Sequence, residues 1–170
     1  MKKVNISVEL IRSAKKIELL LMDCDGVLTD GRLYYSAEGE ALKTFHVHDG
    51  QGIKLWHRAG FRSGIITGRE SKMLEVRSQE LGIDFLCQSS KNKMLDLNRI
   101  ADDCGLGLGQ IAYVGDDLSD SDVLSAVGLP VLVANAAIKL ERSDALETNK
   151  CGGFGAIREV VDLLLELKSK

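Results

Sequence analysis

The sequence lacks the features that mark several large classes of protein. No apolar run approaches the roughly 20 residues that a membrane-spanning helix requires, and the first residues lack the apolar core of a secretion signal. The 170 residues carry a net charge of -3, with no basic stripe and no alternation of aromatic and basic residues. We therefore expect a cytoplasmic protein that binds neither a membrane nor nucleic acid.

Closely paired cysteines are absent as well. The four cysteines are scattered, with no Cys-x-x-Cys pair of the kind that binds zinc or performs redox chemistry: Cys24, Cys87, Cys104 and Cys151. We interpret them as reduced and structural. Cys24 lies between two aspartates, so in an extended segment its side chain is expected to face away from them as a buried thiol.

The chain contains short apolar runs that alternate with longer amphipathic stretches. The short runs predict strands at residues 17–22, 62–66, 85–88, 111–114 and 130–133. The amphipathic stretches predict helices at residues 52–59, 71–81, 93–104, 121–127 and 156–167. This alternation indicates an α/β fold with a doubly wound, Rossmann-like parallel sheet. Since 45% of the residues are hydrophobic, one core suffices and we expect one domain over residues 1–170.

Residues 32–45 break the alternation. Two runs rich in aromatic and apolar residues flank the turn-like residues 36–40, which predicts a β-hairpin that is too short to be a cap domain. A projecting hairpin is prone to edge pairing, and pairing with copies of itself would protect it. We therefore expect the chain to form an oligomer.

Candidate catalytic residues follow four of the predicted strands. They are Asp23 and Asp25 after the first, Thr67-Gly68-Arg69 after the second, Lys91 and Lys93 after the third, and Gly115-Asp116-Asp117 after the fourth. Each alone is compatible with an ordinary turn or helix cap. Together they would meet at the carboxyl edge of the sheet, where open α/β sheets place their active sites.

Two carboxylates one residue apart repel each other unless a cation lies between them. A hard divalent ion with oxygen ligands, typically Mg²⁺, is the expected solution for Asp23 and Asp25. Carboxylates, a hydroxyl and a lysine suit phosphoryl transfer. No Gly-x-x-x-x-Gly-Lys-Ser/Thr motif occurs in the sequence, which excludes a Walker-type phosphate loop.

The four groups resemble the four motifs of the haloacid dehalogenase-like phosphatases: residues 23–31 (DCDGVLTDG), residues 65–69 (IITGR), Lys93 and residues 113–117 (YVGDD). Within that superfamily the chain resembles the small capless branch that acts on phosphorylated keto sugar acids. The likeness includes the hairpin, residues 45–54 (FHVHDGQGIK) and the tail at residues 152–159 (GGFGAIRE). It implies a homotetramer in which the glycine tail covers the active site of a neighbouring subunit.

The resemblance also implies residue roles. Asp23 would be the nucleophile and Asp25 the general acid and base, while Thr67 would hydrogen-bond the phosphoryl group and Lys93 would neutralise its charge. Mg²⁺ would be held by Asp23, Asp25 and Asp116, and the backbone carbonyl of Asp25 would be a further ligand. The family spacing favours Lys93 over its neighbour Lys91 for this role. Asp117 would support the metal site or cap a helix.

The same resemblance implies that the sugar acid is bound by the stretch after the hairpin and by several cations: His46, His48, Asp49, Gly50, Lys54, Arg69 and Arg77. An arginine fork suits a 2-keto acid carboxylate. This sequence has His46, His48 and Lys54 where these phosphatases commonly have Asn, Arg and Arg. The alternative for the two histidines is one exposed face of an extended segment, and the alternative for Arg77 is an ordinary surface position on a helix.

The expected activity is therefore magnesium-dependent hydrolysis of 3-deoxy-D-manno-octulosonate 8-phosphate through an aspartyl phosphate. A nonulosonate 9-phosphate of the sialic-acid type is the alternative substrate. A regulatory relative without turnover would be expected to have lost a motif residue, and none is lost here. A phosphotransferase such as a mutase would need a cap to exclude water.

Overall fold

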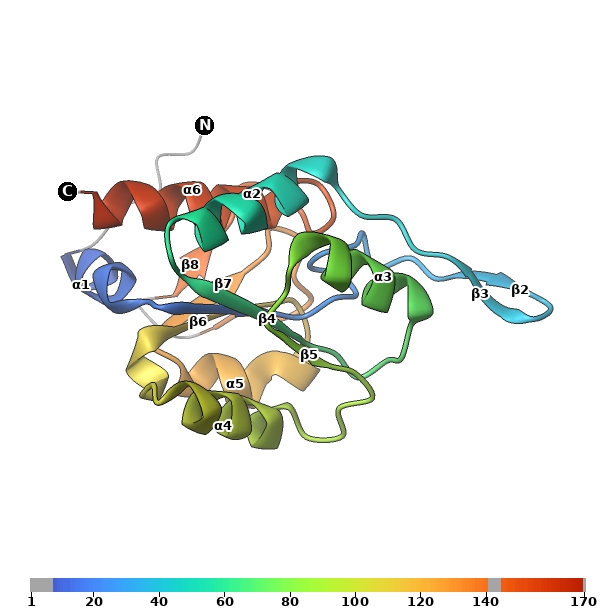
Figure 1. Ribbon diagram of the computed structural model, residues 1–170, viewed down its shortest axis with the longest axis horizontal. Coiled ribbons are helices and arrows are strands. Elements are labelled where there is room, and N and C mark those ends of the chain that lie inside the picture. The colour runs from blue at the N-terminus through green and yellow to red at the C-terminus, as the bar shows by residue number, and fades with distance from the viewer. Residues whose placement is uncertain (1–7, 141–144, 170) are drawn as a thin grey trace.

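The computed structural model describes residues 8–140 and 145–169. A parallel sheet lies between two layers of helices (Figure 1). In the described residues the sheet has six strands in the order β5-β4-β1-β6-β7-β8. The strands are β1 (Leu19–Met22), β4 (Arg62–Ile66), β5 (Phe85–Cys87), β6 (Ile111–Gly115), β7 (Leu129–Leu132) and β8 (Leu146–Glu147). This is the α/β fold with a parallel sheet that the sequence predicts.

The helices cover both faces of the sheet. They are α1 (Val8–Lys16), α2 (Val47–Arg58), α3 (Lys72–Leu81), α4 (Lys93–Cys104), α5 (Ser121–Ala126) and α6 (Ala156–Lys168). In Figure 1 α4 and α5 lie below the sheet, and α2 and α6 lie above it. Two short 3₁₀ helices, η1 (Leu108–Gln110) and η2 (Leu118–Asp120), flank β6. No helix in the described ranges is long and apolar enough to cross a membrane.

The central strand β1 explains why the sheet can carry a site at its edge. All four of its residues are fully buried, since successive side chains enter opposite layers. Leu20 and Met22 pack with the core beneath α1, α2 and α6, and Leu19 packs with α4 and α5 on the other face. Met22 pairs with Ile65 of β4 on one side and with Val114 of β6 on the other. The carboxyl ends of the three strands are therefore level.

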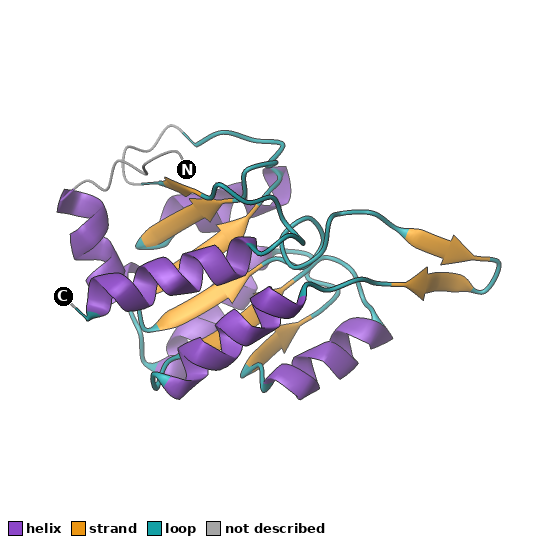
Figure 2. Ribbon diagram, turned by 90° about the horizontal axis from the view of Figure 1, so that it is seen from above, coloured by secondary structure: helices purple, strands orange, loops and turns teal. Residues whose placement is uncertain are grey.

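The hairpin consists of β2 (Tyr34–Ser36) and β3 (Gly39–Leu42), which pair antiparallel as a separate sheet. It projects away from the α/β body (Figure 2). Three of its apolar side chains are exposed, with Leu33 at 48%, Tyr35 at 60% and Leu42 at 50%. The predicted hairpin is thus present and presents apolar surface.

All five predicted strands and all five predicted helices are present, and nearly every end lies within two residues of its predicted position. The exception is α2, which begins at Val47, five residues before its predicted start at Gly52. The His46 side chain caps the helix by accepting the His48 backbone N–H at 3.2 Å. The interpretation of His46 and His48 as one face of an extended segment is therefore wrong. Helix α1 and strand β8 were not predicted.

Candidate active site

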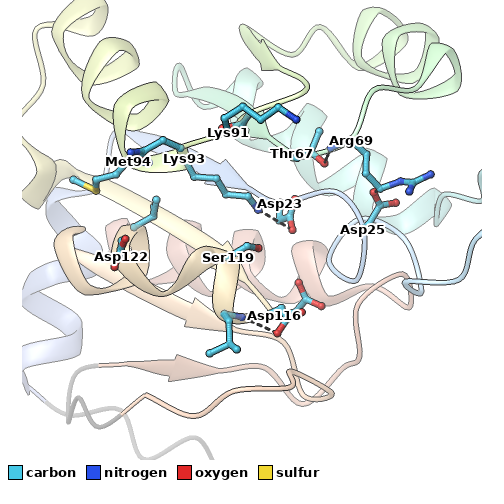
Figure 3. A pocket seen from close by; sticks show the side chains of 16 residues that line it. Asp23, Asp25, Thr67, Arg69, Lys91, Lys93, Met94, Asp116, Ser119 and Asp122 are labelled. Atoms are coloured by element: carbon cyan, nitrogen blue, oxygen red, sulfur yellow. Dashed lines mark hydrogen bonds and ion pairs between the residues drawn. The ribbon is translucent and has the colours of Figure 1, made fainter.

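One pocket lies at the carboxyl edge of the sheet and brings together the ends of the four strands. Its lining includes Asp23 and Asp25 after β1, Thr67 and Arg69 after β4, Lys91 and Lys93 after β5, and Asp116 and Asp117 after β6. Figure 3 shows Asp23, Lys93 and Asp116 on one side of this pocket and Asp25 with Arg69 on the other. The convergence expected from the strand ends is therefore observed.

Asp23 and Lys93 form the buried centre of the pocket. Lys93 Nζ lies 3.0 Å from Asp23 Oδ2, and each residue is 7% exposed. Lys93 opens α4, where the side chain of Asn92 caps the helix. Burial raises the pKa of Asp23 to about 6 even though Lys93 opposes the shift. For Lys93, burial lowers the pKa, but the carboxylates of Asp23 and Asp120 outweigh it and raise the pKa.

Asp120 is a residue of the site that sequence reasoning missed. It is fully buried, and its Oδ1 accepts from Tyr113 Oη at 2.7 Å and from Lys93 Nζ at 2.8 Å. Its Oδ2 accepts the backbone N–H of Asp116 at 3.1 Å and of Asp117 at 3.3 Å. With donors on both oxygens, Asp120 organises the loop after β6 and positions Lys93. The only sequence signal is a third aspartate four residues after Asp116, which is also typical of a helix start.

Asp25 lies apart from the carboxylates of Asp23, Asp116 and Asp120. Its Oδ1 pairs with Lys43 Nζ at 2.5 Å, and its Oδ2 lies 3.6 Å from Arg69 Nε. Thr67 is 2% exposed, and its Oγ1 accepts the Arg69 backbone N–H at 3.4 Å. Asp25 and Arg69 thus form the rim of the pocket, and Thr67 forms part of its wall.

Cys24 has the surroundings expected from its position between the two aspartates. It is fully buried, and burial raises the pKa of its thiol well above the ordinary value. The four cysteines are free thiols in the structure.

The residues predicted to bind the sugar do not converge on this pocket in the single chain. Arg69 lines the pocket, whereas His46, Asp49, Gly50 and Arg77 line a second, smaller cavity between α2 and α3. His48 and Lys54 lie on α2 outside the linings of both.

Two of these residues have clear structural contacts. Asp49 is 1% exposed and accepts the backbone N–H of Gly155 at 3.1 Å and of Arg158 at 2.8 Å, which ties α2 to the start of α6. Arg77 pairs with Glu80 at 2.9 Å, and its guanidinium carbon lies 5.8 Å from the ring centroid of Phe45. Their roles in binding substrate stay predictions.

The comparison with known proteins decides the family. No protein-family model matches the chain. The chain is 42% identical to the 3-deoxy-D-manno-octulosonate 8-phosphate phosphatase KdsC of Escherichia coli (strain K12), over 97% of its own length and 88% of that protein. It is 40% identical to KdsC of Yersinia pestis, over 97% of its own length and 88% of that protein. The chain belongs to the KdsC phosphatase family.

Solved structures agree with this assignment. The crystal structure of the Y. pestis KdsC phosphatase superposes with a TM-score of 0.91 at 40% identity, covering 96% of this chain and 88% of that one. The structure from Moraxella catarrhalis, a complex with magnesium, phosphate and KDO, superposes with a TM-score of 0.88 at 38% identity, covering 95% and 92%. The resemblance to haloacid dehalogenase-like phosphatases is confirmed.

The acidic cluster of Asp23, Asp116 and Asp120 fits a magnesium ion, which the M. catarrhalis relative binds. Asp23, Asp116 and Asp120 each offer a carboxylate oxygen, and these oxygens lie within 4.8 Å of one another. Asp116 Oδ1 is buried with no hydrogen-bond partner among the described residues. Burial, together with the charges of Asp23 and Asp120, raises the pKa of Asp116 to about 7. A hard divalent cation would relieve this repulsion and give the free oxygen a partner.

The donor set also shows which aspartates are available as ligands. Asp120 already accepts two donors on each oxygen. Asp23 lines the pocket with one partner on each oxygen, the Cys24 N–H at 2.7 Å and Lys93 Nζ at 3.0 Å, and Asp116 lines it with Oδ1 unpartnered among the described residues. Asp116 lies directly against Gly26, whose φ is +92°, and a side chain there would overlap the carboxylate. The glycine thus lets the loop after β1 approach Asp116 closely.

Proposed function

We propose that the chain is a magnesium-dependent phosphatase that hydrolyses 3-deoxy-D-manno-octulosonate 8-phosphate to the free sugar acid and phosphate. The observation that carries this proposal is the buried pair of Asp23 and Lys93 beside Asp116, in a chain 42% identical to KdsC. A nucleophilic carboxylate, a fixed cation and a second carboxylate that needs a metal are the parts that aspartyl-phosphate chemistry requires.

In the first step, an oxygen of Asp23 attacks phosphorus and the bond between phosphorus and the sugar oxygen breaks. Lys93, 3.0 Å from Asp23 Oδ2, lies where it can neutralise charge on the transferring group, and Thr67 donates a hydrogen bond to it. Asp25 in its protonated form gives its proton to the departing sugar oxygen. Magnesium held by Asp23, Asp116 and the Asp25 carbonyl would supply positive charge to the phosphoryl oxygens.

In the second step, Asp25, now a carboxylate, takes a proton from water. The resulting hydroxide attacks phosphorus, which releases phosphate and restores the Asp23 carboxylate. The same residue thus serves first as acid and then as base, and the proton balance closes over one turnover.

We also propose that residues 1–170 act as one capless domain in a cytoplasmic homotetramer. The exposed Leu33, Tyr35 and Leu42 of the hairpin support association, since apolar side chains on a projecting hairpin gain from being covered. Phe154, 58% exposed in the glycine tail, is the side chain we place over a neighbouring subunit's pocket. The free cysteines support a reducing compartment.

The test is phosphate release from the octulosonate 8-phosphate and from a nonulosonate 9-phosphate, each with and without magnesium. The Asp23→Asn variant, matched in volume, is the blank. A magnesium-dependent preference for the octulosonate is expected. Preference for the nonulosonate would change the substrate, and release from neither by a folded protein would contradict the proposed function.

A further inference from the structure

Lys43 links the root of the hairpin to the catalytic loop. It directly follows β3, yet its side chain is only 4% exposed, and its Nζ reaches Asp25 across 18 positions of sequence. Removing an ammonium group from water is costly unless partners compensate. The contacts of Lys43 therefore explain why this lysine is turned inward.

The two oxygens of Asp25 have different surroundings. Oδ1 is held by Lys43 Nζ at 2.5 Å. Oδ2 is buried, has no hydrogen-bond partner among the described residues, and lies 3.6 Å from Arg69 Nε. Asp25 lines the pocket together with Asp23 and Thr67. One oxygen is thus anchored, and the other is left for a proton donor or acceptor.

Glu40 of β3 holds Lys43 in turn. Its Oε1 lies 3.5 Å from Lys43 Nζ and 3.7 Å from Arg69 Nη2, and its Oε2 accepts from Ser71 Oγ at 2.5 Å. The Glu40 side chain is 17% exposed. Arg69 also donates to Tyr35 Oη in β2 at 2.8 Å. Both strands of the hairpin are therefore tied to the rim that carries Asp25.

We propose that Lys43 is a positioning residue for the general acid: it anchors Asp25 Oδ1 so that Oδ2 faces the leaving oxygen of the substrate. The sequence did not point to this role, because it depends on a contact between the hairpin and the aspartate loop. The proposal rests on the proposed function, since it gives a structural basis to the acid step of that reaction.

The test uses substrates that differ in how much they need an acid. A sugar alkoxide leaves poorly without a proton, phenolate leaves more readily, and 4-nitrophenolate needs no proton. The constant to compare is kcat/KM, which covers the steps up to loss of the leaving group and omits the later attack of water. General acid catalysis is worth about 10²- to 10⁴-fold, so its misplacement affects the poor leaving groups selectively.

For Lys43→Met we expect kcat/KM to fall about 100-fold with the octulosonate phosphate, less with phenyl phosphate, and under about threefold with 4-nitrophenyl phosphate. Lys43→Arg keeps the charge and is expected to restore part of the loss. In an Asp25→Asn background, Lys43→Met should cause no further change in these ratios. The control is Lys72→Met, which removes an exposed ion pair with Glu75 and should leave all three constants unchanged.

Equal losses on all three substrates would overturn the proposal, because a general loss of structure affects them alike. Additive losses in the Asp25→Asn background would overturn it as well. Should Lys43→Met not fold, Lys43→Gln and Lys43→Arg supply the same ratios. Phenyl phosphate and 4-nitrophenyl phosphate contain no sugar. If the wild-type protein hydrolyses these two and does not hydrolyse the octulosonate phosphate, the proposed substrate is refuted, and the role of Lys43 can still be tested with the two aryl phosphates.

Discussion

Replacing Asp116 by asparagine should stabilise the metal-free protein while abolishing its response to magnesium. Asparagine has nearly the same volume as the carboxylate that packs against Gly26, so the change removes charge without creating a cavity. The reason for the gain is the burial of the Asp116 charge, together with repulsion from Asp23 and Asp120, which raises the pKa of Asp116 to about 7 from 3.8. A neutral amide does not experience that repulsion.

The magnitude follows from linkage. A rise of about three pKa units corresponds to about 4 kcal/mol at 1.36 kcal/mol per unit. Asp116 is only partly buried and faces an open pocket, so solvent screening reduces this to about 1–2 kcal/mol. For a chain of this length the gain should raise Tm by about 4 °C.

The direction in which the stability of the folded protein changes with pH follows from this raised pKa. An acid whose folded pKa is raised keeps its proton in the folded state while the unfolded state has lost it, so stability falls as pH rises from about 4 to about 7. The advantage of Asp116→Asn should grow over that window and stay constant above it. Thermal unfolding of both proteins in chelator, at pH 5 and pH 8, measures this.

Magnesium should reverse the order of stability of the wild-type protein and Asp116→Asn. At pH 8 the ion binds the deprotonated wild-type cluster and raises its Tm, and Asp116→Asn, lacking a ligand, should show little shift and no phosphatase activity. Equal stability of the two proteins in chelator at pH 8, or an equal rise of both with magnesium, would refute the argument that Asp116 is a strained metal ligand.

Three further substitutions have defined outcomes. Lys93→Met leaves the buried carboxylate of Asp120 without its cation, so it should cost about 3 kcal/mol in denaturant unfolding and lower kcat by about 10³-fold; retention of activity would exclude Lys93 from the reaction. Gly152→Ala places a methyl 1.7 Å from the Gly26 carbonyl oxygen, so it should lower Tm by about 5 °C, and an unchanged Tm would contradict that close approach. Tyr113→Phe removes a donor to Asp120 and should cost about 1–2 kcal/mol with the fold retained, measured by denaturant unfolding; no loss would mean that this hydrogen bond is dispensable.

The fold could be predicted because its signals are local. A buried strand such as Leu19–Met22 is a continuous apolar run, and α4 coincides with its predicted range. The start of α2 was wrong because histidine is an uncommon helix cap, so His46 gave no recognisable start signal. Strand β8 is two residues long and gives too little pattern to detect.

The candidate site likewise contains residues that could be predicted from the sequence and residues that could not. Residues at strand ends, such as Asp23 and Thr67, could be placed together because parallel strands bring their carboxyl ends to one edge. Asp120 and Lys43 could not, since their roles depend on contacts made only after folding, with Tyr113 and with Asp25. Sequence patterns report period and spacing, and they do not report which buried polar groups meet.

Asp49 accepts hydrogen bonds from the backbone N–H groups of Gly155 and Arg158, and these bonds have a consequence for the proposed assembly. Gly155 is held by Asp49 at 3.1 Å, and Gly153 N–H donates to the Val27 carbonyl at 2.9 Å. The exposed Phe154 between them thus stands on a loop that is ordered within its own chain. A side chain on a loop whose backbone is already held adds little backbone entropy cost when it meets another surface, so more of its contact energy is available for affinity.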